Sequence, residues 1–257
     1  MTVRGFVSLV GAGPGDPELL TLRACNRLRG AEVVVYDRLI DPAVLDLVSN
    51  EAERVFAGKA RGLHVLDQRA IEAVLIDRAR AGRRVVRLKG GDPFLFGRGG
   101  EEVEALVAAG IPYEVVPGIS SALAAPAAAE IPVTHRGLSS CLTVVTGHED
   151  PSKPETAIDW EWLARASGTV VILMGLDRTE RIAERLIAAG RHSRTPAAII
   201  SRGTFSDQRS IFAPLNEIAS VAENAGLRSP AIIVLGDVTR FPSILASLVQ
   251  EHMPCAV

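Results

Sequence analysis

Short apolar runs alternate with helix-like segments through the first half of the chain. Apolar and β-branched residues fill Phe6–Val10, Val33–Tyr36 and Val85–Leu88, a pattern that is typical of short buried strands. Helical periodicity covers Pro17–Arg29 and Val65–Ala81, which lie between these runs. The alternation predicts a parallel α/β layout.

A proline interrupts this pattern near the middle of the chain. A helix over Glu101–Ala109 and a strand over Tyr113–Val116 lead to Pro117-Gly118, and an alanine-rich helix is expected from about Ser120. Such an interruption is a plausible domain boundary. We therefore predict an N-terminal α/β domain over residues 1–117 and a C-terminal α/β domain over residues 118–257.

The second half repeats the alternation of strands and helices. Predicted strands cover Leu142–Thr146, Thr169–Met174, Ala197–Ser201 and Ala231–Leu235, with helices over Thr179–Ala189 and Leu215–Asn224. Arg209–Phe212 predicts a further strand that could run antiparallel, and the polar stretch Glu149–Ala157 predicts a surface connection. The expected architecture is two α/β domains with mainly parallel sheets, whose strand ends face a shared cleft.

Composition and charge narrow the classes of function. The chain has 257 residues, 47% of them hydrophobic, which is enough for one large globular domain or two smaller ones. A net charge of -2 and an aromatic content of 4% argue against a nucleic-acid or membrane-surface binder. The five histidines are scattered without ligand spacing, so no bound metal is expected.

The cysteines and the apolar segments bear on the cellular setting. Cys25, Cys141 and Cys255 are odd in number and widely spaced, which fits a reducing cytoplasm better than a disulfide framework. Met1–Val10 is too short for a signal peptide, and Ala122–Ala129 is too short to span a bilayer. We expect a soluble cytoplasmic protein.

The stretch Lys89–Glu102 is the strongest candidate for a binding loop. It follows a predicted strand, precedes a predicted helix and is rich in glycine, which lets the backbone approach a ligand closely. Ligands of open α/β sheets bind at such positions. Within this loop Asp92 is a candidate acceptor for ligand hydroxyl groups.

A second glycine turn, Gly11–Pro17, follows the first predicted strand. A dinucleotide-binding fingerprint requires a third glycine where Asp16 stands, so that interpretation fails. Asp16-Pro17 instead suits a helix N-cap and first-turn residue. A P-loop is excluded as well, because Ala60 follows Gly58-Lys59.

Five segments of the chain form a combination of motifs: Val10–Pro17, Tyr36–Leu39, Gly90–Glu102, Val116–Ser121 and Pro132–Arg136. Together they closely resemble the uroporphyrinogen-III C-methyltransferases of the tetrapyrrole methylase family, and the match runs from about Val7 to Val238. The first motif is shared by tetrapyrrole methylases generally. The segment Phe96–Glu102 and the Thr-His-Arg segment are specific to this subgroup, so the resemblance implies a tetrapyrrole methylase-like fold.

The resemblance also implies a reaction, a cofactor and an assembly. Methyl groups pass from S-adenosylmethionine to carbons 2 and 7 of uroporphyrinogen III, which gives precorrin-2 on the way to sirohaem or cobalamin and leaves S-adenosylhomocysteine. The cofactor is expected in the inter-domain cleft of a homodimer. Its expected contacts are Pro14, Gly90, Gly91, Asp92, Leu95, Ser120, Ser121, Met174, Gly203, Pro230 and Ala231.

The family pattern further suggests roles in catalysis and substrate binding. Asp37 is the suggested base, with Lys59 as a candidate acid. Arg38, Arg98, His135 and Arg136 are the candidates for binding the substrate carboxylates.

Simpler interpretations of the same residues stay open. Asp37 could be a strand-end turn residue, Met174 a core methionine, Ser120 and Ser121 a helix cap, and the arginines solvated surface residues. Two other functions also stay open, a nicotinamide-dependent oxidoreductase and a non-catalytic nucleotide-binding module.

Overall fold

The computed structural model describes residues 5–58, 67–149 and 156–252 and divides the chain into two compact units. Unit 1 is Met1–Ser120 and unit 2 is Ser121–Val257. The division falls a few residues after the boundary predicted at residue 117. Each unit has its own sheet and its own cores, and each is described separately below.

Unit 1 is built on a five-stranded parallel sheet with the strand order β3-β2-β4-β1-β5. Its strands are β1 (Phe6–Gly11), β2 (Val33–Tyr36), β3 (Glu53–Phe56), β4 (Arg84–Lys89) and β5 (Tyr113–Val116). Its helices are η1 (Pro17–Leu19), α1 (Leu22–Arg29), α2 (Pro42–Leu45), α3 (Gln68–Arg80) and α4 (Gly99–Ala108). The parallel layout predicted for the first half is confirmed.

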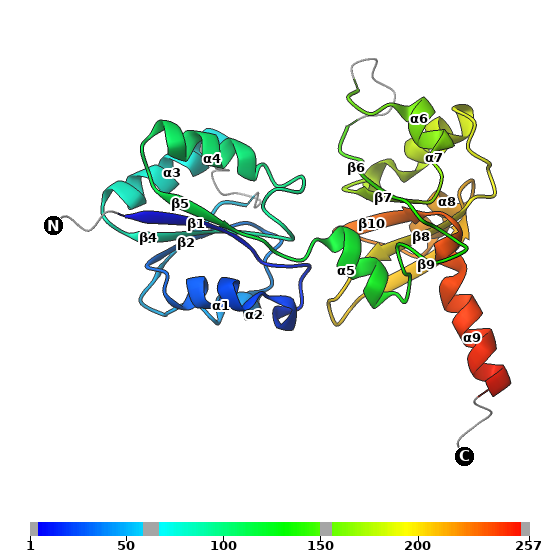
Figure 1. Cartoon of the computed structure of the whole chain (residues 1–257), viewed down its shortest axis with the longest axis horizontal. Coiled ribbons are helices and arrows are strands. Elements are labelled where there is room, and N and C mark those ends of the chain that lie inside the picture. Colours follow the sequence, from blue (N-terminus) through cyan, green and yellow to red (C-terminus); the bar gives the residue numbers. More distant parts are fainter. Residues whose placement is uncertain (1–4, 59–66, 150–155, 253–257) are drawn as a thin grey trace. The chain divides into compact units, whose positions relative to one another are not determined.

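Helices cover both faces of this sheet (Figure 1), α1 and α2 on one side and α3 and α4 on the other. Successive strand residues point to opposite faces. Accordingly Val7 and Leu9 join the core under α3 and α4, while Val10 joins the core under α1 and α2. Burial on both faces explains why these strands are continuous apolar runs in the sequence.

The helix predicted over Pro17–Arg29 is wrong in its first part, because the segment forms two elements. The Asp16 carboxylate accepts the Glu18 N–H at 2.8 Å and caps the short helix η1, as its N-cap interpretation predicted. Leu20 is then extended, and the Thr21 hydroxyl accepts the Ala24 N–H at 3.1 Å and starts α1. Two side-chain caps therefore divide one apolar pattern into two elements.

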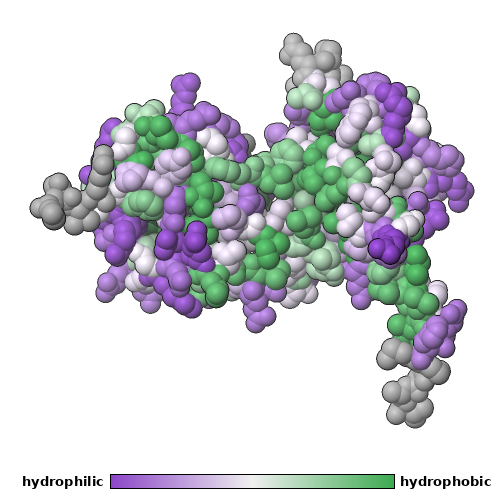
Figure 2. Space-filling view, in the orientation of Figure 1, coloured by the Kyte–Doolittle hydropathy of each residue, from purple (hydrophilic) through white to green (hydrophobic). Residues whose placement is uncertain are grey.

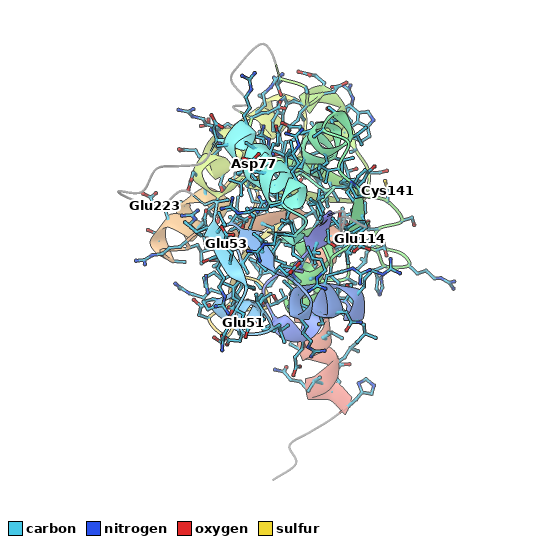
Figure 3. All side chains as sticks on the ribbon, turned by 90° about the vertical axis from the view of Figure 1, so that its left-hand side faces the viewer. Glu51, Glu53, Asp77, Glu114, Cys141 and Glu223 are labelled. Carbon is cyan, nitrogen blue, oxygen red and sulfur yellow. The ribbon has the colours of Figure 1, made fainter. Side chains whose placement is uncertain are left out.

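Two arginine–glutamate pairs mark the two edges of the same sheet. Glu53 on β3 pairs with Arg78 at 2.6 Å, and Glu114 on β5 pairs with Arg27. β3 and β5 are the outer strands, and Figure 3 shows Glu53 and Glu114 on opposite sides of the unit. These pairs tie helices α3 and α1 to the sheet edges.

Unit 2 has a mixed five-stranded sheet with the order β6-β7-β10-β8-β9. Its strands are β6 (Leu142–Thr146), β7 (Thr169–Leu173), β8 (Pro196–Ser201), β9 (Arg209–Pro214) and β10 (Ala231–Leu235). Its helices are α5 (Ser121–Ala128), α6 (Trp160–Arg165), η2 (Leu176–Arg178), α7 (Thr179–Ala188), α8 (Ile218–Asn224), η3 (Asp237–Arg240) and α9 (Phe241–His252).

The expectation of mainly parallel sheets holds for unit 1 but not for unit 2. Among the strands that the structure describes in unit 2, only β6 and β7 pair in parallel, whereas β10 runs antiparallel to both β7 and β8, and β9 runs antiparallel to β8. The connection from Ser201 to Arg209 is too short for a parallel crossover, so β8 and β9 form a hairpin. The antiparallel strand considered for Arg209–Phe212 is thus confirmed.

Two cores hold unit 2 together, one on each face of its sheet. Alternate strand residues such as Ile172 and Ile199 pack with α6, α7 and α8, while Val171 and Ile200 pack with Ala122 and Ala125 of α5. Figure 1 shows α5 on the face opposite α6 and α7.

The last helix differs from the others in unit 2. α9 has no buried residue among those described, and it projects from the sheet (Figure 1). Ile244, Leu248 and Val249 are exposed, and α9 carries a green apolar surface in Figure 2. Within the described ranges no helix is both long and apolar enough to cross a membrane.

Candidate functional site

Two glycine loops of unit 1 meet at the carboxyl edge of its sheet. Parallel pairing places the end of β1 beside the end of β4, with Gly11 opposite Lys89. Just beyond, the Gly13 N–H donates to the Gly91 carbonyl at 3.2 Å, and the Gly91 N–H donates to the Gly13 carbonyl at 2.7 Å. The structure therefore brings the loop of Pro14 and the loop of Gly90 and Gly91 together.

A third loop, which follows β5, packs against both. A Cβ atom at Gly118 would overlap the Gly91 carbonyl oxygen and the Gly11 backbone. The Asp92 carboxylate accepts the Gly118 N–H at 3.1 Å and the Phe94 N–H at 2.8 Å. Asp92 thus fixes two loops to each other, a role that sequence reasoning did not assign to it. Ser120, another predicted contact, follows in the same loop.

Exposed apolar side chains gather on the loops at this edge. Exposed hydrophobic residues follow β2, β4 and β5, namely Leu39, Phe94, Leu95, Phe96 and Ile119. Large apolar groups exposed together on a protein surface are typical of a binding site. The predicted contact Leu95 is one of them.

Asp37 stands at the end of β2 and has two polar neighbours. Its Oδ1 accepts the Leu39 N–H at 3.0 Å, which is the turn geometry of the simpler interpretation. Its Oδ2 lies 3.7 Å from Nη2 of Arg87. Arg38, the next residue, is exposed. Lys59 lies outside the described residues.

Behind Asp37 lies a buried charged cluster that sequence reasoning missed. Because alternate residues of a strand point to the same face of the sheet, Arg87 and Lys89 of β4 both lie on the face that α4 covers, opposite Glu102. One Glu102 oxygen accepts from Arg87 Nε and from Lys89 Nζ, each at 3.0 Å. The side chains of Arg87 and Lys89 are 5% exposed and that of Glu102 is 0% exposed.

The cluster connects the core of unit 1 to its candidate site. Arg87 Nη1 also donates to the Val35 and Leu88 carbonyls at 3.3 and 3.1 Å, so the guanidinium that faces Asp37 is held in place. Burial lowers the pKa of Lys89, as does the nearby Arg87, while Glu102 and Asp37 oppose that change. The sequence carries one signal for this cluster, because Arg87 and Lys89 are two cations at alternate positions of a central buried strand.

The predicted contacts of unit 2 also meet at one edge of its sheet. Leu173 pairs with Ile232, and Ser201 pairs with Ala231, so Met174, Ala231 and Gly203 lie at the same end of β7, β10 and β8. The Arg202 N–H donates to the Pro230 carbonyl at 2.8 Å. Four predicted contacts from three strands are therefore neighbours. Ser121, the fifth in this unit, is the first residue of α5.

Met174 is not a core methionine. Its side chain is 48% exposed, and its φ of 57° lies in the left-handed region that a residue with a long side chain rarely adopts. Residues in that region cost free energy and are concentrated at functional sites. Burial does not account for this position, which favours a binding role for Met174.

The same backbone feature recurs on the other candidate loops. Among the described residues other than glycine, those with positive φ are Phe96, Arg98, Glu130, Met174, Arg202 and Thr204. All but Glu130 lie on loops that carry predicted site residues. Gly203 also has a packing role, because a Cβ atom there would overlap Ala125 of α5.

The four candidate substrate cations do not form one cluster within either unit. Arg98 precedes α4 and pairs with Glu101 at 2.6 Å on the surface. The His135 ring packs against Phe241 with 5.1 Å between ring centroids, and its buried Nδ1 has no hydrogen-bond partner within the described part of the chain. Arg136 is exposed.

His135 lies at the other end of the unit 2 sheet from Met174. Its N–H donates to the Ser139 carbonyl, and the Ser139 hydroxyl accepts from Thr169 at the start of β7. Met174 follows the end of the same strand.

Throughout the described ranges, no three His, Cys, Asp or Glu side chains are grouped as metal ligands would be.

Unit 1 has glycine loops at the ends of parallel strands, and unit 2 has a mixed sheet with a strained methionine at its edge. Together these features define a class of protein. Residues 7–219 match the family model of the tetrapyrrole (corrin/porphyrin) methylases, and the chain belongs to that family.

Individual relatives agree with this assignment. The chain is 54% identical to an S-adenosyl-L-methionine-dependent uroporphyrinogen III methyltransferase of Methanosarcina barkeri, over 94% of each chain. It is 47% identical to siroheme synthase 2 of Yersinia pestis, over 96% of this chain but 52% of that one. The chain therefore spans about half the length of the siroheme synthases that it matches.

A solved structure has the same fold. The uroporphyrin-III C-methyl transferase of Thermus thermophilus, in complex with S-adenosylhomocysteine, superposes with a TM-score of 0.79. It is 44% identical in sequence, and the match covers 92% of this chain and 99% of that one. The expected tetrapyrrole methylase fold is confirmed.

Proposed function

We infer that this chain is an S-adenosylmethionine-dependent methyltransferase that methylates uroporphyrinogen III at carbons 2 and 7. The product is precorrin-2, the precursor of sirohaem and cobalamin. The observation that carries this conclusion is the 54% identity with the Methanosarcina methyltransferase, which extends over 94% of both chains. Because the siroheme synthases are about twice as long, nothing beyond methyl transfer is inferred from them.

The residues present fit the cofactor. At the unit 1 edge, Gly91 has a φ of 66° and a Cβ atom at Gly118 would overlap the Gly91 carbonyl, so this edge is built of close-packed glycine backbone without side chains. Leu95 of unit 1 and Met174 of unit 2 are apolar and exposed, so each is available for contact with a ligand. When bound, S-adenosylmethionine supplies a methyl group activated by a positively charged sulfur.

The protein has to orient the ring carbon and exclude water. Orientation of reactants alone can contribute about 7–11 kcal/mol to lowering a barrier. A new carbon–carbon bond at the ring carbon leaves that ring with a proton to lose. We assign this proton to the Asp37 carboxylate, which Leu39 and Arg87 orient from two sides. Lys59 is proposed as an acid on the basis of the family resemblance.

Exchange of Asp37 for Asn tests the base assignment. We expect turnover to fall by about 10²–10⁴-fold, the usual contribution of a general base, with unchanged affinity for S-adenosylhomocysteine. The matched control is Asp46→Asn, which changes an exposed carboxylate that ends α2. Turnover of Asp37→Asn close to that of the control would remove Asp37 from the mechanism.

The substrate carries several carboxylates, so its binding needs cations. We propose Arg38, Arg98, His135 and Arg136 for this role, since guanidinium groups pair well with carboxylates. Arg98 is exposed, so its Glu101 partner can be exchanged for a substrate carboxylate. Arg98→Glu and Arg136→Glu should each raise KM for uroporphyrinogen, whereas Arg80→Glu, an exposed control at the end of α3, should not. An unchanged KM in both of these variants would refute the assignment of these cations to substrate binding.

Two other functions make different predictions about ligand binding. A nicotinamide-dependent oxidoreductase would be protected from heat by a dinucleotide and not by S-adenosylhomocysteine. Asp16 argues against it, because its carboxylate occupies the position of the third fingerprint glycine and caps η1. A regulatory module would bind S-adenosylhomocysteine but would show no turnover.

A cytoplasmic setting and a homodimer are part of the same proposal. The free thiols of Cys25 and Cys141 support a reducing compartment. The exposed apolar residues of α9, Ile244, Leu248 and Val249, support contact with a second copy. Sedimentation of the purified chain tests the dimer, and a monomer at micromolar concentration would contradict it.

A further inference from the structure

A pocket lies in unit 2, at the end of its sheet opposite the end that carries Met174. It has a volume of about 410 Å³, and its lining includes Gly168, Arg191, Arg194, Thr195 and Arg240. Gly168 precedes β7, Thr195 precedes β8, and Gly236, also in the lining, follows β10. The predicted cofactor contacts of this unit lie at the other ends of the same strands. The pocket is therefore separate from them.

The lining of this pocket carries an excess of positive charge. Arg191, Arg194 and Arg240 contribute three guanidinium groups, and among the described residues of the lining the single carboxylate is that of Asp237. Asp237 lies 3.8 Å from Arg240, and both side chains are mostly exposed. Among the residues that the structure describes, Arg191 and Arg194 have no carboxylate partner.

Arg191 is the unusual member of this group because it is buried. The residue is 9% exposed, and its buried Nε atom has no hydrogen-bond partner among the residues that the structure describes. Its Nη1 donates to the Leu163 carbonyl at 3.1 Å, near the carboxyl end of α6. Burial lowers the pKa of Arg191. A helix-end carbonyl compensates a full charge only in part, so a buried cation here is costly without an anion.

The neighbouring histidine adds a donor to the same lining. His192 Nδ1 accepts the Arg194 N–H at 3.1 Å, which assigns the proton of the neutral ring to Nε2. His192 is exposed and lines the pocket. The lining thus offers cationic and neutral hydrogen-bond donors around one cavity.

We propose that this pocket binds a small oxyanion, either a phosphate or a carboxylate group, with Arg191 at its base and Arg194 and Arg240 at its rim. Planar guanidinium groups bind such oxygens through paired, charge-assisted hydrogen bonds. The anion supplies the counter-charge that buried Arg191 lacks. The predicted cofactor contacts of unit 2 lie at the other end of the sheet, so phosphate binding can be tested without cofactor or tetrapyrrole.

Calorimetric titration of the full chain with inorganic phosphate tests the proposal, with ionic strength held constant by chloride. We expect saturable binding to the wild type. Loss of the two rim arginines in Arg194→Gln/Arg240→Gln should weaken it about tenfold or more, given the worth of hydrogen bonds to charged groups. Arg209→Gln, an exposed arginine outside the pocket, should bind like the wild type.

A second variant, Arg191→Met, tests the buried group directly. Arg191→Met should abolish phosphate binding. If Arg191→Met fails to fold, the result for Arg194→Gln/Arg240→Gln tests the proposal by itself. Succinate in a parallel titration distinguishes a carboxylate ligand from a phosphoryl ligand. No saturable binding of either anion, or equal binding by the wild type and the rim variant, would overturn the proposal.

Discussion

The buried cluster around Glu102 gives a sharp prediction for stability. Glu102→Gln keeps the size of the side chain but removes the negative charge between two buried cations, Arg87 and Lys89. At 3.0 Å, each pair gains about 5.5 kcal/mol by Coulomb's law at an effective dielectric constant of about 20. Most of this gain offsets the desolvation of the three groups in the folded protein.

Breaking a buried ion pair from one side leaves its partner uncompensated, which typically costs about 3–5 kcal/mol. Here two cations lose their partner at once, so we expect at least the upper part of that range. Total stabilities are about 5–15 kcal/mol, and the variant should therefore unfold at much lower urea concentration. The two cations would then face Asp37 as their remaining carboxylate neighbour among the described residues.

Urea unfolding of Glu102→Gln and Glu101→Gln is the matched comparison. Glu101 is the neighbouring residue of α4, but its carboxylate pairs with Arg98 on the surface, where ion pairs contribute little. We expect a large decrease in midpoint for Glu102→Gln and almost none for Glu101→Gln. Equal midpoints in the two variants would refute the reasoning.

Stability as a function of pH gives a second signature of the cluster. The pKa of Lys89 is lower in the folded than in the unfolded chain, mainly through burial. Between these two pKa values the unfolded chain binds more protons, so stability rises with pH across that window. Glu102 opposes the lowering, and its loss should extend the window to lower pH.

Two further variants test other parts of unit 1. Gly118→Ala should impair folding and S-adenosylhomocysteine binding, because the added Cβ atom overlaps the Gly91 carbonyl. The control Gly100→Ala adds a Cβ atom in open space and should leave both properties unchanged. Equal stability and binding in the two variants would contradict the loop packing. Arg27 lowers the pKa of Glu114 by hydrogen bonding, so the stability from this pair is present above the ordinary glutamate pKa and lost as pH falls through the lowered one. Glu114→Gln should flatten that acid limb of the urea midpoint, and an unchanged pH profile would contradict this assignment.

The sequence predicts the order of elements well because buried strands and amphipathic helices carry strong periodic signals. Strands such as Val33–Tyr36 and Leu142–Thr146 form as predicted. Strand direction in unit 2 is not encoded in this way, since a strand buried on both faces is a continuous apolar run whichever way it runs. Short elements held by caps, such as α2 after Asp41, have too few residues for a periodic signal.

The candidate site was predictable only in part, for a related reason. Glycine loops and motif residues identify the edges of the two sheets, where the structure pairs Gly13 with Gly91 in unit 1 and Ser201 with Ala231 in unit 2. The roles of Asp92 and Glu102 depend on contacts with residues distant in the sequence, such as Gly118 and Arg87. Such contacts leave no local pattern, and they appear only once the chain is folded.

The central claim is that this chain methylates uroporphyrinogen III twice. The most direct measurement is anaerobic incubation of the purified chain with uroporphyrinogen III and S-adenosylmethionine, followed by mass spectrometry of the tetrapyrrole. We expect the mass of the tetrapyrrole to increase by two methyl groups. An unchanged tetrapyrrole mass, in a folded chain that binds S-adenosylhomocysteine, would contradict the claim and indicate a different acceptor within the same methylase fold.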